Sequence, residues 1–408
     1  MFQKQEGGVV AAKGFYATGL HAGIKKVKKD MALIYSDAPC AAAGTFTTNI
    51  VKAAPVKWDM AIVHERRKAQ AIVINSGIAN TCTGAQGMEY CRQMAEKTAG
   101  LLALQEEDVL VASTGIIGRQ LPMDKVTAGI EHMVSMLGNT LEDGTLASEA
   151  ILTTDTYPKT MAFSFEIEGK TVTLGGISKG SGMVHPNMCT VLSFLTTDLN
   201  ISAELLQEAL LEDVKVTYNM ISVDGDTSTN DSVLLLANGK AGNRKITEKN
   251  ADYELFCKAL NKINVYFSKR IAGDGEGSTS LLEAKVVGAK SKEEASVLAR
   301  SMVSSILTKT AITGRDANWG RFLCAMGYSG IVFEPENVDL YFASKVGKVQ
   351  VVSQGMAAEY SEEEATQILS AGEVSVIADM HMGESSAAAW GCDLTHEFVK
   401  INAEYRKK

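Results

Sequence analysis

The sequence predicts a mixed α/β protein whose helices and strands pack in layers. Segments with helical periodicity alternate along the chain with short apolar or alternating runs. Of the 408 residues, 46% are hydrophobic and 22% are charged, which is enough apolar material for a sizeable core. Two adjacent runs within residues 163–173 resemble a hairpin, which argues against a purely parallel sheet. At roughly 150 residues per domain, the length suggests two or three domains.

The helices are predicted from apolar residues that recur every three or four positions. They are expected at residues 88–104, 123–137, 203–214, 248–268, 292–308 and 362–369. The strands are predicted from short runs rich in β-branched and aromatic residues. They are expected at residues 71–75, 109–112, 162–167, 171–174, 191–195, 232–236 and 338–342. Proline is scarce, so no proline-rich linker marks a domain border.

Charge and cysteine content narrow the functional class. The net charge is −8, and no basic block is longer than residues 406–408, so neither a nucleic-acid partner nor an anionic-membrane partner is expected. The seven cysteines form no C-x-x-C pair and show no zinc-ligand spacing, which favours reduced thiols and predicts no metal site. The chain shows neither an apolar secretory signal nor a membrane-spanning segment. We therefore expect a soluble, cytoplasmic protein.

Glycine and small polar residues concentrate directly after apolar runs. Such loops let a backbone approach a ligand closely and present N–H groups to it. A tight turn between buried strands is the alternative for any single cluster, but five similar clusters predict at least one functional loop. The clusters are residues 75–80, 113–118, 178–182, 224–231 and 273–279.

Common motifs do not account for these clusters. The last cluster lacks the Gly-Lys-Ser/Thr end of a P-loop. The fourth begins like a calcium loop but has Thr229 and Leu235 where glycine and glutamate are needed. It also resembles the D-x-D-x-T start of aspartate-nucleophile phosphatases, except that Ser228 takes the threonine position. A Ser-His-Asp hydrolase is disfavoured, because His185 is more consistent with a local hydrogen-bonding residue than with a triad base.

The segment 178–194 offers a different chemistry. It runs from a polar stretch into an apolar strand that begins with Thr190. The Thr190 hydroxyl can attack the carbonyl of Cys189, and an N-to-O acyl shift followed by hydrolysis would leave Thr190 with a free α-amine. That amine has a reference pKa of about 7.7–8.0 and can act as general base for its own hydroxyl. On these grounds alone, an ordinary β-branched strand residue is the favoured interpretation of Thr190.

Eight segments, in the right order, resemble the ornithine acetyltransferase family of arginine biosynthesis, also called the glutamate N-acetyltransferase family. Around the family's self-cleavage site the pattern is close to KGSGMxxPNMATML, and residues 179–192 read KGSGMVHPNMCTVL. The other matches are NSGIANTCTG (75–84), STGIIG (113–118), ILTTDTYPK (151–159), VDGDTSTND (223–231), GDGEGST (273–279), GRDANWGR (314–321) and INAEYR (401–406). On these motifs the chain is identified as a member of the family.

This resemblance implies a fold and a processing step. The implied fold is ornithine acetyltransferase-like, an N-terminal-nucleophile fold with mixed sheets flanked by helices. The precursor would cut itself between Cys189 and Thr190 into an α chain, residues 1–189, and a β chain, residues 190–408, with a C-terminal domain over roughly 250–408. The two pieces would stay associated, as an α2β2 particle, and Thr190 would be the nucleophile.

The resemblance also assigns site residues. Thr114 and Gly115 match the family's oxyanion-hole pair, which stabilises a developing alkoxide. The positions that hold the substrate match Thr153, Lys179, Thr190, Glu276, Asn402 and Lys407. A zwitterionic N-acetyl amino acid needs a cation for its carboxylate and an anion for its amine. Lys179 and Glu276 are chemically suited to that division.

The implied reaction is ping-pong acyl transfer. Thr190 takes the acetyl group from N2-acetyl-L-ornithine and passes it to L-glutamate, while its α-amine shuttles the proton. Some family members also accept acetyl-CoA as donor, and no metal or permanently bound cofactor is implied. Two residues depart from the family pattern, Cys189 where alanine is usual and Lys407 where threonine or serine is usual. Lys407 either supplies a different substrate contact or changes the donor preference.

Two other functions and several residue roles stay open. A related N-terminal-nucleophile amidase or aminopeptidase would share the cleavage but use water as acceptor, and an uncleaved, inactive homologue would only bind. Residues 224–231 either contact substrate or brace the core. Trp319 is expected to pack, and His185 and Asn187 are candidates for positioning the scissile loop.

Overall fold

The computed structural model describes residues 2–185 and 191–404, which form two compact units. Unit 1 holds the described residues of Met1–Gly180, Asn187–Lys215 and Thr227–Phe267, and unit 2 holds those of Ser181–Pro186, Val216–Asp226 and Ser268–Lys408. Each unit therefore combines residues from both sides of the expected cleavage site. The expected chain boundaries, 1–189 and 190–408, concern the covalent backbone and stay a prediction, as does the C-terminal domain over roughly 250–408.

Unit 1 is built on a sheet of nine described strands. They are β1 (Gln3–Gln5), β2 (Phe15–Leu20), β3 (Met31–Phe46), β4 (Lys68–Ile78), β5 (Val109–Ile116), β6 (Lys159–Ile167), β7 (Lys170–Lys179), β8 (Leu192–Thr197) and β10 (Ser232–Ala237). Their order is β1-β6-β7-β8-β10-β3-β4-β5, and β2 pairs with β3. β10 is parallel to β8 and β5 is parallel to β4, whereas the other neighbours are antiparallel. The mixed α/β class predicted from the sequence is therefore confirmed.

β6 and β7 form the expected hairpin. Phe163 pairs with Leu174, and Ile167 pairs with Lys170 across the turn. The two turn residues are Glu168 and Gly169, whose φ angles are 50° and 71°. Positive φ at both positions matches the right-handed twist of the flanking strands, so this local sequence fixes the antiparallel pairing.

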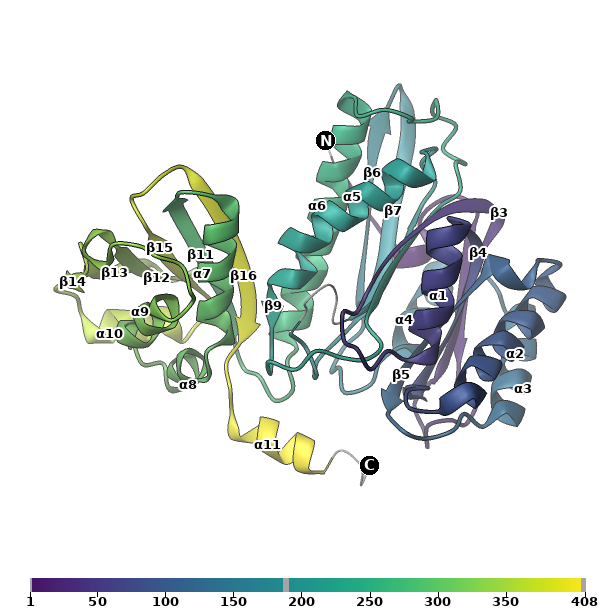
Figure 1. Ribbon diagram of the computed structural model, residues 1–408, viewed down its shortest axis with the longest axis horizontal. Coiled ribbons are helices and arrows are strands. Elements are labelled where there is room, and N and C mark those ends of the chain that lie inside the picture. Colours follow the sequence, from purple (N-terminus) through teal and green to yellow (C-terminus); the bar gives the residue numbers. More distant parts are fainter. Residues whose placement is uncertain (1, 186–190, 405–408) are drawn as a thin grey trace. The chain divides into compact units, whose positions relative to one another are not determined.

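Six helices of the described chain accompany this sheet (Figure 1). They are α1 (Ala54–Glu65), α2 (Gly84–Leu102), α3 (Met123–Ser135), α4 (Leu141–Ala150), α5 (Ala203–Val216) and α6 (Ala251–Gly273), and the border between the units falls within α6. Successive strand residues face opposite sides of a sheet. Met31 and Leu33 accordingly pack with α2 and α3, whereas Ala32 and Ile34 pack with α1 and α4. The sheet thus has a separate apolar core on each face.

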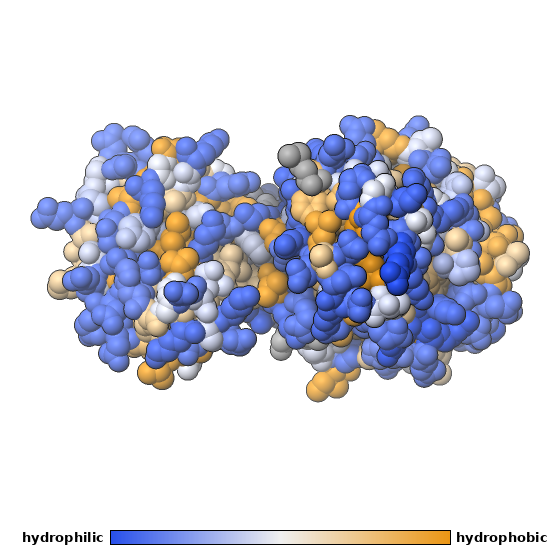
Figure 2. All heavy atoms as spheres, turned by 90° about the horizontal axis from the view of Figure 1, so that it is seen from above, coloured by the Kyte–Doolittle hydropathy of each residue, from blue (hydrophilic) through white to orange (hydrophobic). Residues whose placement is uncertain are grey.

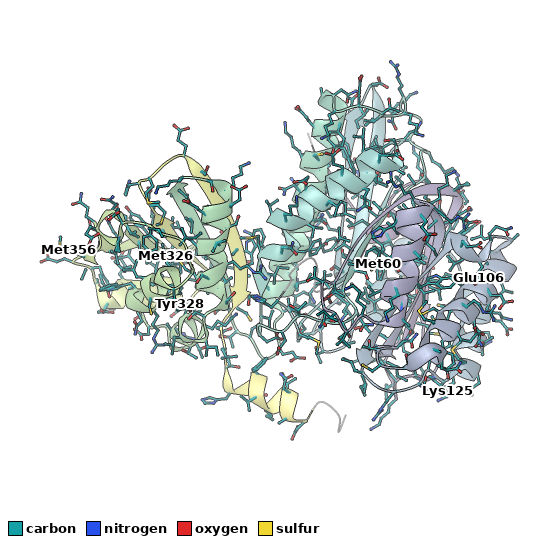
Figure 3. The ribbon with its side chains drawn as sticks, in the orientation of Figure 1. Met60, Glu106, Lys125, Met326, Tyr328 and Met356 are labelled. Carbon is teal, nitrogen blue, oxygen red and sulfur yellow. The ribbon has the colours of Figure 1, made fainter. Side chains whose placement is uncertain are left out.

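Unit 2 contains a second mixed sheet of seven described strands. They are β9 (Ile221–Ser222), β11 (Leu281–Ala289), β12 (Asp339–Ala343), β13 (Lys348–Ser353), β14 (Met356–Ala357), β15 (Glu373–Asp379) and β16 (Ser385–Cys392), in the order β14-β13-β12-β15-β11-β16-β9. Its helices are α7 (Lys292–Ser304), α8 (Ile306–Gly314), α9 (Trp319–Gly327), α10 (Glu362–Leu369) and α11 (His396–Ala403). On α9 Met326 is buried, whereas Tyr328, just beyond the helix, is 64% exposed (Figure 3).

The helix expected over residues 292–308 is wrong, because the chain forms two helices there, α7 and α8. They meet at Ser305, whose backbone is extended, with φ −69° and ψ 125°. The Ser305 side chain accepts a hydrogen bond from the backbone N–H of Thr308. A serine that ends one helix and caps the next satisfies an otherwise orphan N–H group.

Hydrophilic residues cover most of the visible face of each unit (Figure 2). The most exposed large apolar residues, among them Val27, Ile50 and Val332, are scattered along the sequence. None of the helices in the described part of the chain combines the length and the apolar character needed to cross a bilayer.

Candidate active site

Thr114 and Gly115 lie at the end of β5, beside the end of β4. Gly115 opposes Gly77 in the parallel register. Its φ is 130°, and a Cβ added there would lie 2.5 Å from the carbonyl oxygen of Gly77. An L side chain fits neither that backbone conformation nor that space. The predicted oxyanion pair therefore has a backbone shape that depends on glycine, and Thr114 beside it is buried.

Three of the glycine-rich and polar clusters meet beside this pair. Asn230 Nδ2 donates to the carbonyl oxygens of Ala79 and Ser113 at 2.6 and 2.8 Å. Asn230 Oδ1 accepts a hydrogen bond from Thr81 Oγ1 at 2.7 Å. Ser113 Oγ in turn donates to Asn75 Oδ1 at 2.6 Å. One buried amide thus ties together the loop after β4, the end of β5 and the loop before β10.

The loop that carries Thr153 is held against the same strand ends. Ser76 Oγ, near the end of β4, donates to the carbonyl oxygen of Ala150 at 2.5 Å. Lys25 Nζ donates to the carbonyl oxygen of Leu152 at 2.6 Å. Both bonds end on backbone, so they fix the course of the chain just before Thr153.

Lys25 is a cation that the sequence analysis did not single out. Its stem runs beside Gly77, since a Cβ added at Gly77 would lie 3.1 Å from Lys25 Cγ. Burial lowers the pKa of Lys25 to about 8, although Asp30 opposes this effect. Lys179 lowers the same pKa further, so the two ammonium groups are within electrostatic reach of each other.

Lys179 ends β7 beside a buried ion pair. Asp155 Oδ1 accepts from Lys159 Nζ at 2.7 Å and from the backbone N–H of Gly180 at 2.8 Å. Asp155 Oδ2 accepts from the N–H of Thr153 at 3.1 Å. Burial disfavours ionisation of Asp155, but Lys159 and Lys179 outweigh it, and the pKa of Asp155 is lowered. An ionised Asp155 therefore joins the Thr153 loop to the start of the segment that leads to Thr190.

Glu276 and Asn402 contact each other in unit 2. Asn402 Nδ2, on α11, donates to Glu276 Oε2 at 2.7 Å. The backbone N–H of Glu276 donates to the carbonyl oxygen of Ser181 at 3.0 Å. A Cβ added at Gly182 would lie 2.5 Å from Glu276 Oε1, so the glycine makes room for this carboxylate. The two predicted substrate residues of unit 2 thus lie against residues 181–182.

Asp224 braces the segment that leads toward the expected cleavage site. Its carboxylate accepts from the backbone N–H groups of Met183 and Val184 at 2.6 and 2.9 Å. The N–H of Val223 donates to the carbonyl oxygen of Val184 at 2.6 Å. Of the two alternatives for residues 224–231, these contacts and the Asn230 network favour the bracing role.

His185 is the last described residue of that segment. Its Nδ1 lies 2.9 Å from Ser222 Oγ. Burial lowers the pKa of His185 to about 4, and the nearby Arg300 and Lys309 reinforce the shift. His185 is therefore uncharged at neutral pH and acts as a local hydrogen-bonding residue, as expected from the sequence.

The candidate residues fall into three groups. In unit 1 the contacts gather Thr114, Gly115, Thr153 and Lys179. Glu276 and Asn402 pair in unit 2. The cleavage-site residues Cys189 and Thr190, together with Asn187 and Lys407, lie outside the described residues, and the roles expected of them stay predictions.

Comparison with known proteins gives a family match over nearly the whole chain. The model of the ArgJ family matches residues 16–407. The chain is 49% identical to the arginine biosynthesis bifunctional protein ArgJ of Thermotoga neapolitana, over 97% of this chain and 99% of that protein. It is 52% identical to the arginine biosynthesis bifunctional protein ArgJ 1 of Clostridium acetobutylicum, over 96% of each.

Two solved structures are similar to parts of the chain. The arginine biosynthesis bifunctional protein ArgJ of Bacillus halodurans has 43% identity and a TM-score of 0.45, covering 46% of this chain and 98% of that chain. The ornithine acetyltransferase of Mycobacterium tuberculosis, complexed with ornithine, has 39% identity and a TM-score of 0.43, covering 47% of this chain and 100% of that chain.

Proposed function

The chain belongs to the ArgJ family, and from this premise we propose that it is a self-cleaving acetyltransferase of arginine biosynthesis. It moves the acetyl group of N2-acetyl-L-ornithine to L-glutamate, and it also takes acetyl-CoA as a first donor if it shares the bifunctional activity named for its relatives. The observation that carries the proposal is the full-length match to ArgJ proteins, together with the gathering of Thr114, Gly115, Thr153 and Lys179 in unit 1.

The first step is cleavage of the chain. The Thr190 hydroxyl attacks the carbonyl carbon of Cys189, and the peptide bond to the Thr190 nitrogen breaks as an ester forms. Water then hydrolyses the ester, leaving a carboxylate on Cys189 and a free α-amine on Thr190. Two contacts support this step, because attack on the scissile carbonyl requires that the segment before it be held in place. The Asp224 carboxylate accepts from the backbone N–H groups of Met183 and Val184, and Ser181 Oγ donates to the carbonyl oxygen of Asp274.

The second step is acetyl transfer. The α-amine of Thr190 takes the hydroxyl proton while Thr190 Oγ attacks the acetyl carbonyl, and Thr114 and Gly115 stabilise the oxyanion. Collapse of the tetrahedral intermediate breaks the amide bond, and the proton passes to the departing amine. L-ornithine is released, and the acetyl group remains on Thr190 as an ester. The α-amine of L-glutamate then attacks this ester, which restores Thr190 and yields N-acetyl-L-glutamate.

The two charged groups of the substrate are assigned to residues of opposite charge. The Lys179 ammonium meets the α-carboxylate of the acetyl amino acid, and Glu276 meets the free amine. Thr153 and Asn402 supply neutral hydrogen bonds, and Lys407 replaces the hydroxyl that is usual near the family's C-terminus. The buried Asp155 supports this division, because it balances Lys159 and holds Gly180 next to Lys179.

The remaining parts of the proposal concern assembly and surroundings. The enzyme uses no metal or bound cofactor, works in the cytoplasm, and consists of two α and two β pieces. The small-molecule partners are N-acetylornithine and glutamate. The family assignment supports the assembly, the substrates and the lack of a cofactor. The cysteines are scattered and form no C-x-x-C pair, which favours the reduced thiols of a cytoplasmic protein.

Intact mass spectrometry of the purified protein tests the cleavage. We expect two masses, for residues 1–189 and 190–408, and N-terminal sequencing that finds Thr190 as well as the Met1 end. Thr190→Ser keeps both hydroxyl and amine and should be cut, whereas Thr190→Ala should stay full length. A single chain in the wild type, or cleavage of Thr190→Ala, would show that the proposed nucleophile is wrong.

An acceptor assay separates the transferase from an amidase. With N-acetylornithine alone, we expect one ornithine released per enzyme and an acetyl label retained on Thr190. Continued rapid ornithine release should require glutamate, which removes the label. Ornithine release that is equally fast without glutamate would identify a hydrolase. The same assay with acetyl-CoA and glutamate determines whether the enzyme is bifunctional.

A further inference from the structure

Unit 1 contains a pocket at the other end of its sheet from Thr114 and Gly115. Its volume is about 610 Å³, and its lining includes the start of β4, the end of β10 and the entry to α5. The candidate catalytic loops instead lie where β4 ends and where β10 begins. At about 3.3 Å per residue, the run of β4 from Lys68 to Gly77 spans about 30 Å. The pocket is therefore separate from the site described above.

This pocket is cationic although the protein is acidic. The whole chain has a net charge of −8, yet lysine and arginine outnumber carboxylates in the lining. The charged lining residues are Arg66, Arg67, Lys68 and Lys245 with Glu65 and Glu204. Arg66 is paired outside the pocket, with Glu107 and Asp108. Lys68 and Lys245 are exposed and form no ion pair with any carboxylate in the described part of the chain.

Arg67 has a backbone that favours glycine. Its φ is 53°, and it follows α1 at the point where Arg66 and Arg67 both donate their N–H groups to the carbonyl oxygen of Ile62. Helices often end with glycine in this conformation, because a Cβ is strained there. Arg67 therefore carries a long cationic side chain at a position where glycine would be less strained.

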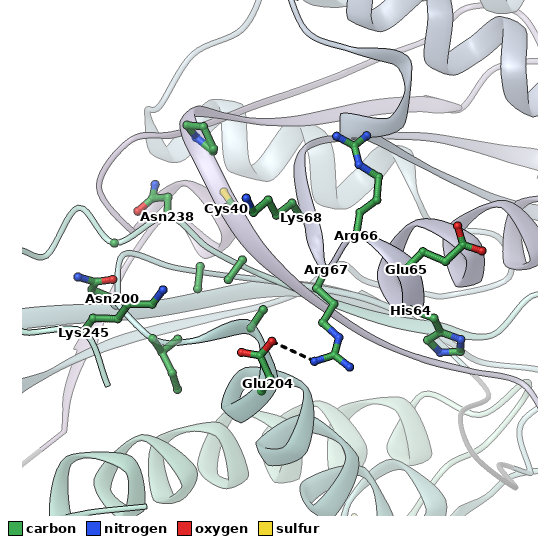
Figure 4. A pocket seen from close by; sticks show the side chains of 16 residues that line it. Cys40, His64, Glu65, Arg66, Arg67, Lys68, Asn200, Glu204, Asn238 and Lys245 are labelled. Atoms are coloured by element: carbon green, nitrogen blue, oxygen red, sulfur yellow. Dashed lines mark hydrogen bonds and ion pairs between the residues drawn. The ribbon is translucent and has the colours of Figure 1, made fainter. Parts of the chain in front are cut away.

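Figure 4 shows where that side chain leads. The Arg67 guanidinium reaches Glu204 at the start of α5, with an N···O distance of 3.1 Å. Lys68, at the start of β4, extends beside Cys40, and Lys245 lines the pocket from the chain beyond β10. Because guanidinium groups bind carboxylate and phosphate with the same geometry, Glu204 occupies the place that an anionic ligand group would take.

We propose that this pocket binds a small multivalent oxyanion, a di- or tricarboxylate or a phosphate ester, held by Arg67, Lys68 and Lys245. The volume lies in the range of small-molecule sites. Asn200 and Asn238 also line the pocket, but Asn200 Nδ2 already donates to the carbonyl oxygen of Asn243, and Asn238 Nδ2 donates to Lys13 and Ser36. The expected ligand contacts are therefore those of the cations. Among the described residues that line the pocket, His64 supplies the one aromatic ring, so the expected ligand is not a stacked base. Arg67 and Lys245 both act on the single carboxylate of Glu204, and Lys68 adds a further positive charge. This excess of cations favours a ligand with more than one negative charge.

Binding is tested by calorimetry on the full protein at low ionic strength, with citrate and with pyrophosphate as separate probes. We expect a submillimolar Kd for at least one probe, and weaker binding as salt is added, because exposed charges are screened. The probe that binds identifies the ligand as a carboxylate or a phosphate, and binding of both identifies the shared oxyanion chemistry. Absence of binding by either probe at 10 mM overturns the proposal.

Paired variants locate the binding. Lys68→Gln with Lys245→Gln should weaken binding of the probe at least about tenfold. Lys57→Gln with Lys170→Gln removes the same charge from exposed positions of unit 1 outside the pocket and should leave the Kd within about twofold. Equal Kd values in the two double variants would show that the probe binds elsewhere.

Variants of Glu204 and Arg67 should change the Kd of the probe in opposite directions. Glu204→Gln releases Arg67 and removes a negative charge, so the probe should bind several times more tightly. Arg67→Gly should weaken binding about tenfold without lowering the thermal midpoint, because glycine suits φ 53°. If Glu204→Gln leaves the Kd unchanged, the Arg67–Glu204 pair is structural and the proposal is wrong. These measurements need no acetyl transfer, so they stand apart from the proposed function.

Discussion

Gly115 is the residue at which the backbone of the candidate site is most constrained. Gly115→Ala places a methyl group against the Gly77 backbone at φ 130°. We expect it to lower the free energy of unfolding by about 2–4 kcal/mol. Since it also displaces the N–H groups of the predicted oxyanion loop, acetyl transfer should fall about 100-fold. Urea unfolding and the transfer assay measure the two effects.

Gly118 in the same loop provides the control. Its φ is 83°, but nothing lies within 4 Å of an added Cβ. Gly118→Ala should therefore show only the cost of positive φ, about 1 kcal/mol. If the two variants were equally stable, the close approach of Gly77 would not be what requires glycine at Gly115.

Lys25 predicts a stability change in alkaline solution. Its pKa is about 8 in the folded protein against 10.5 for an ordinary lysine, so between these values the unfolded chain binds the extra proton. The contribution of Lys25 to the free energy of unfolding therefore increases as the pH rises from about 8 to 10.5. The difference in unfolding free energy between wild type and Lys25→Met should shift in favour of the wild type, by up to about 3 kcal/mol. Urea unfolding of both proteins at pH 7.5 and 10.5 measures it.

Lys26→Met is the matched variant for this measurement, because Lys26 is exposed one position away. The difference between the wild type and Lys26→Met at the same two pH values is the baseline. If the Lys25→Met difference changed no more than this baseline, the Lys25 ammonium would be better solvated than its contacts with Leu152 and Lys29 indicate.

Single residues of the site were predictable only where they fall inside family motifs. Thr114 and Thr153 were assigned in that way, and nothing in their own chemistry distinguishes them from other threonines. Asp155 stood in one of the matched segments, but its role depends on burial next to Lys159, which the sequence does not report. Lys25 was missed because it is one of several lysines in a short stretch, and only the fold shows which of them turns inward.

At the scale of elements, the end of α2 predicts an unusual pair of stabilising substitutions. Ala103 caps the helix with φ 56° and ψ 41°, a conformation that favours glycine, whereas Gly100 lies inside the helix with open space at its Cβ position. Ala103→Gly and Gly100→Ala should each raise the free energy of unfolding by up to about 1 kcal/mol.

The informative result is Ala103→Gly, because an alanine-to-glycine change normally destabilises. Thermal or urea midpoints of the two single variants and of the double variant provide the measurement, and the two effects should add within error only if the residues act independently. A lower midpoint for Ala103→Gly would place Ala103 in the right-handed helical region instead.

Helices and strands were predictable where one face is buried and the other is exposed to solvent. Residues 362–369 coincide with α10, and residues 88–104 overlap α2, because both helices alternate buried and exposed faces. The long strand β3 was missed, since it is mostly buried along its length and rich in alanine, so it shows no alternation. The break between α7 and α8 was missed because apolar periodicity continues across Ser305 and only the cap interrupts it.

At the scale of the whole molecule, the sheet of unit 1 interleaves strands from both sides of the expected cleavage site. β8, from the later part, pairs with β7 over six residue pairs, and β10 pairs with β3 over another six. β8 also pairs with β10, and all residues of both strands are buried. Burying one leucine or phenylalanine contributes about 2 kcal/mol, so the two pieces share one hydrophobic core.

This interleaving predicts that the pieces cannot separate without unfolding. Residues 1–189 and 190–408 should co-elute in gel filtration, even in 1 M NaCl, because the shared contacts are apolar or backbone hydrogen bonds that salt does not screen. In a urea titration, dissociation and loss of the circular dichroism signal should coincide. Co-expression of the two pieces as separate chains gives the same test without self-cleavage. Elution of a folded 190–408 piece on its own would show that β8 and β10 do not depend on β7 and β3.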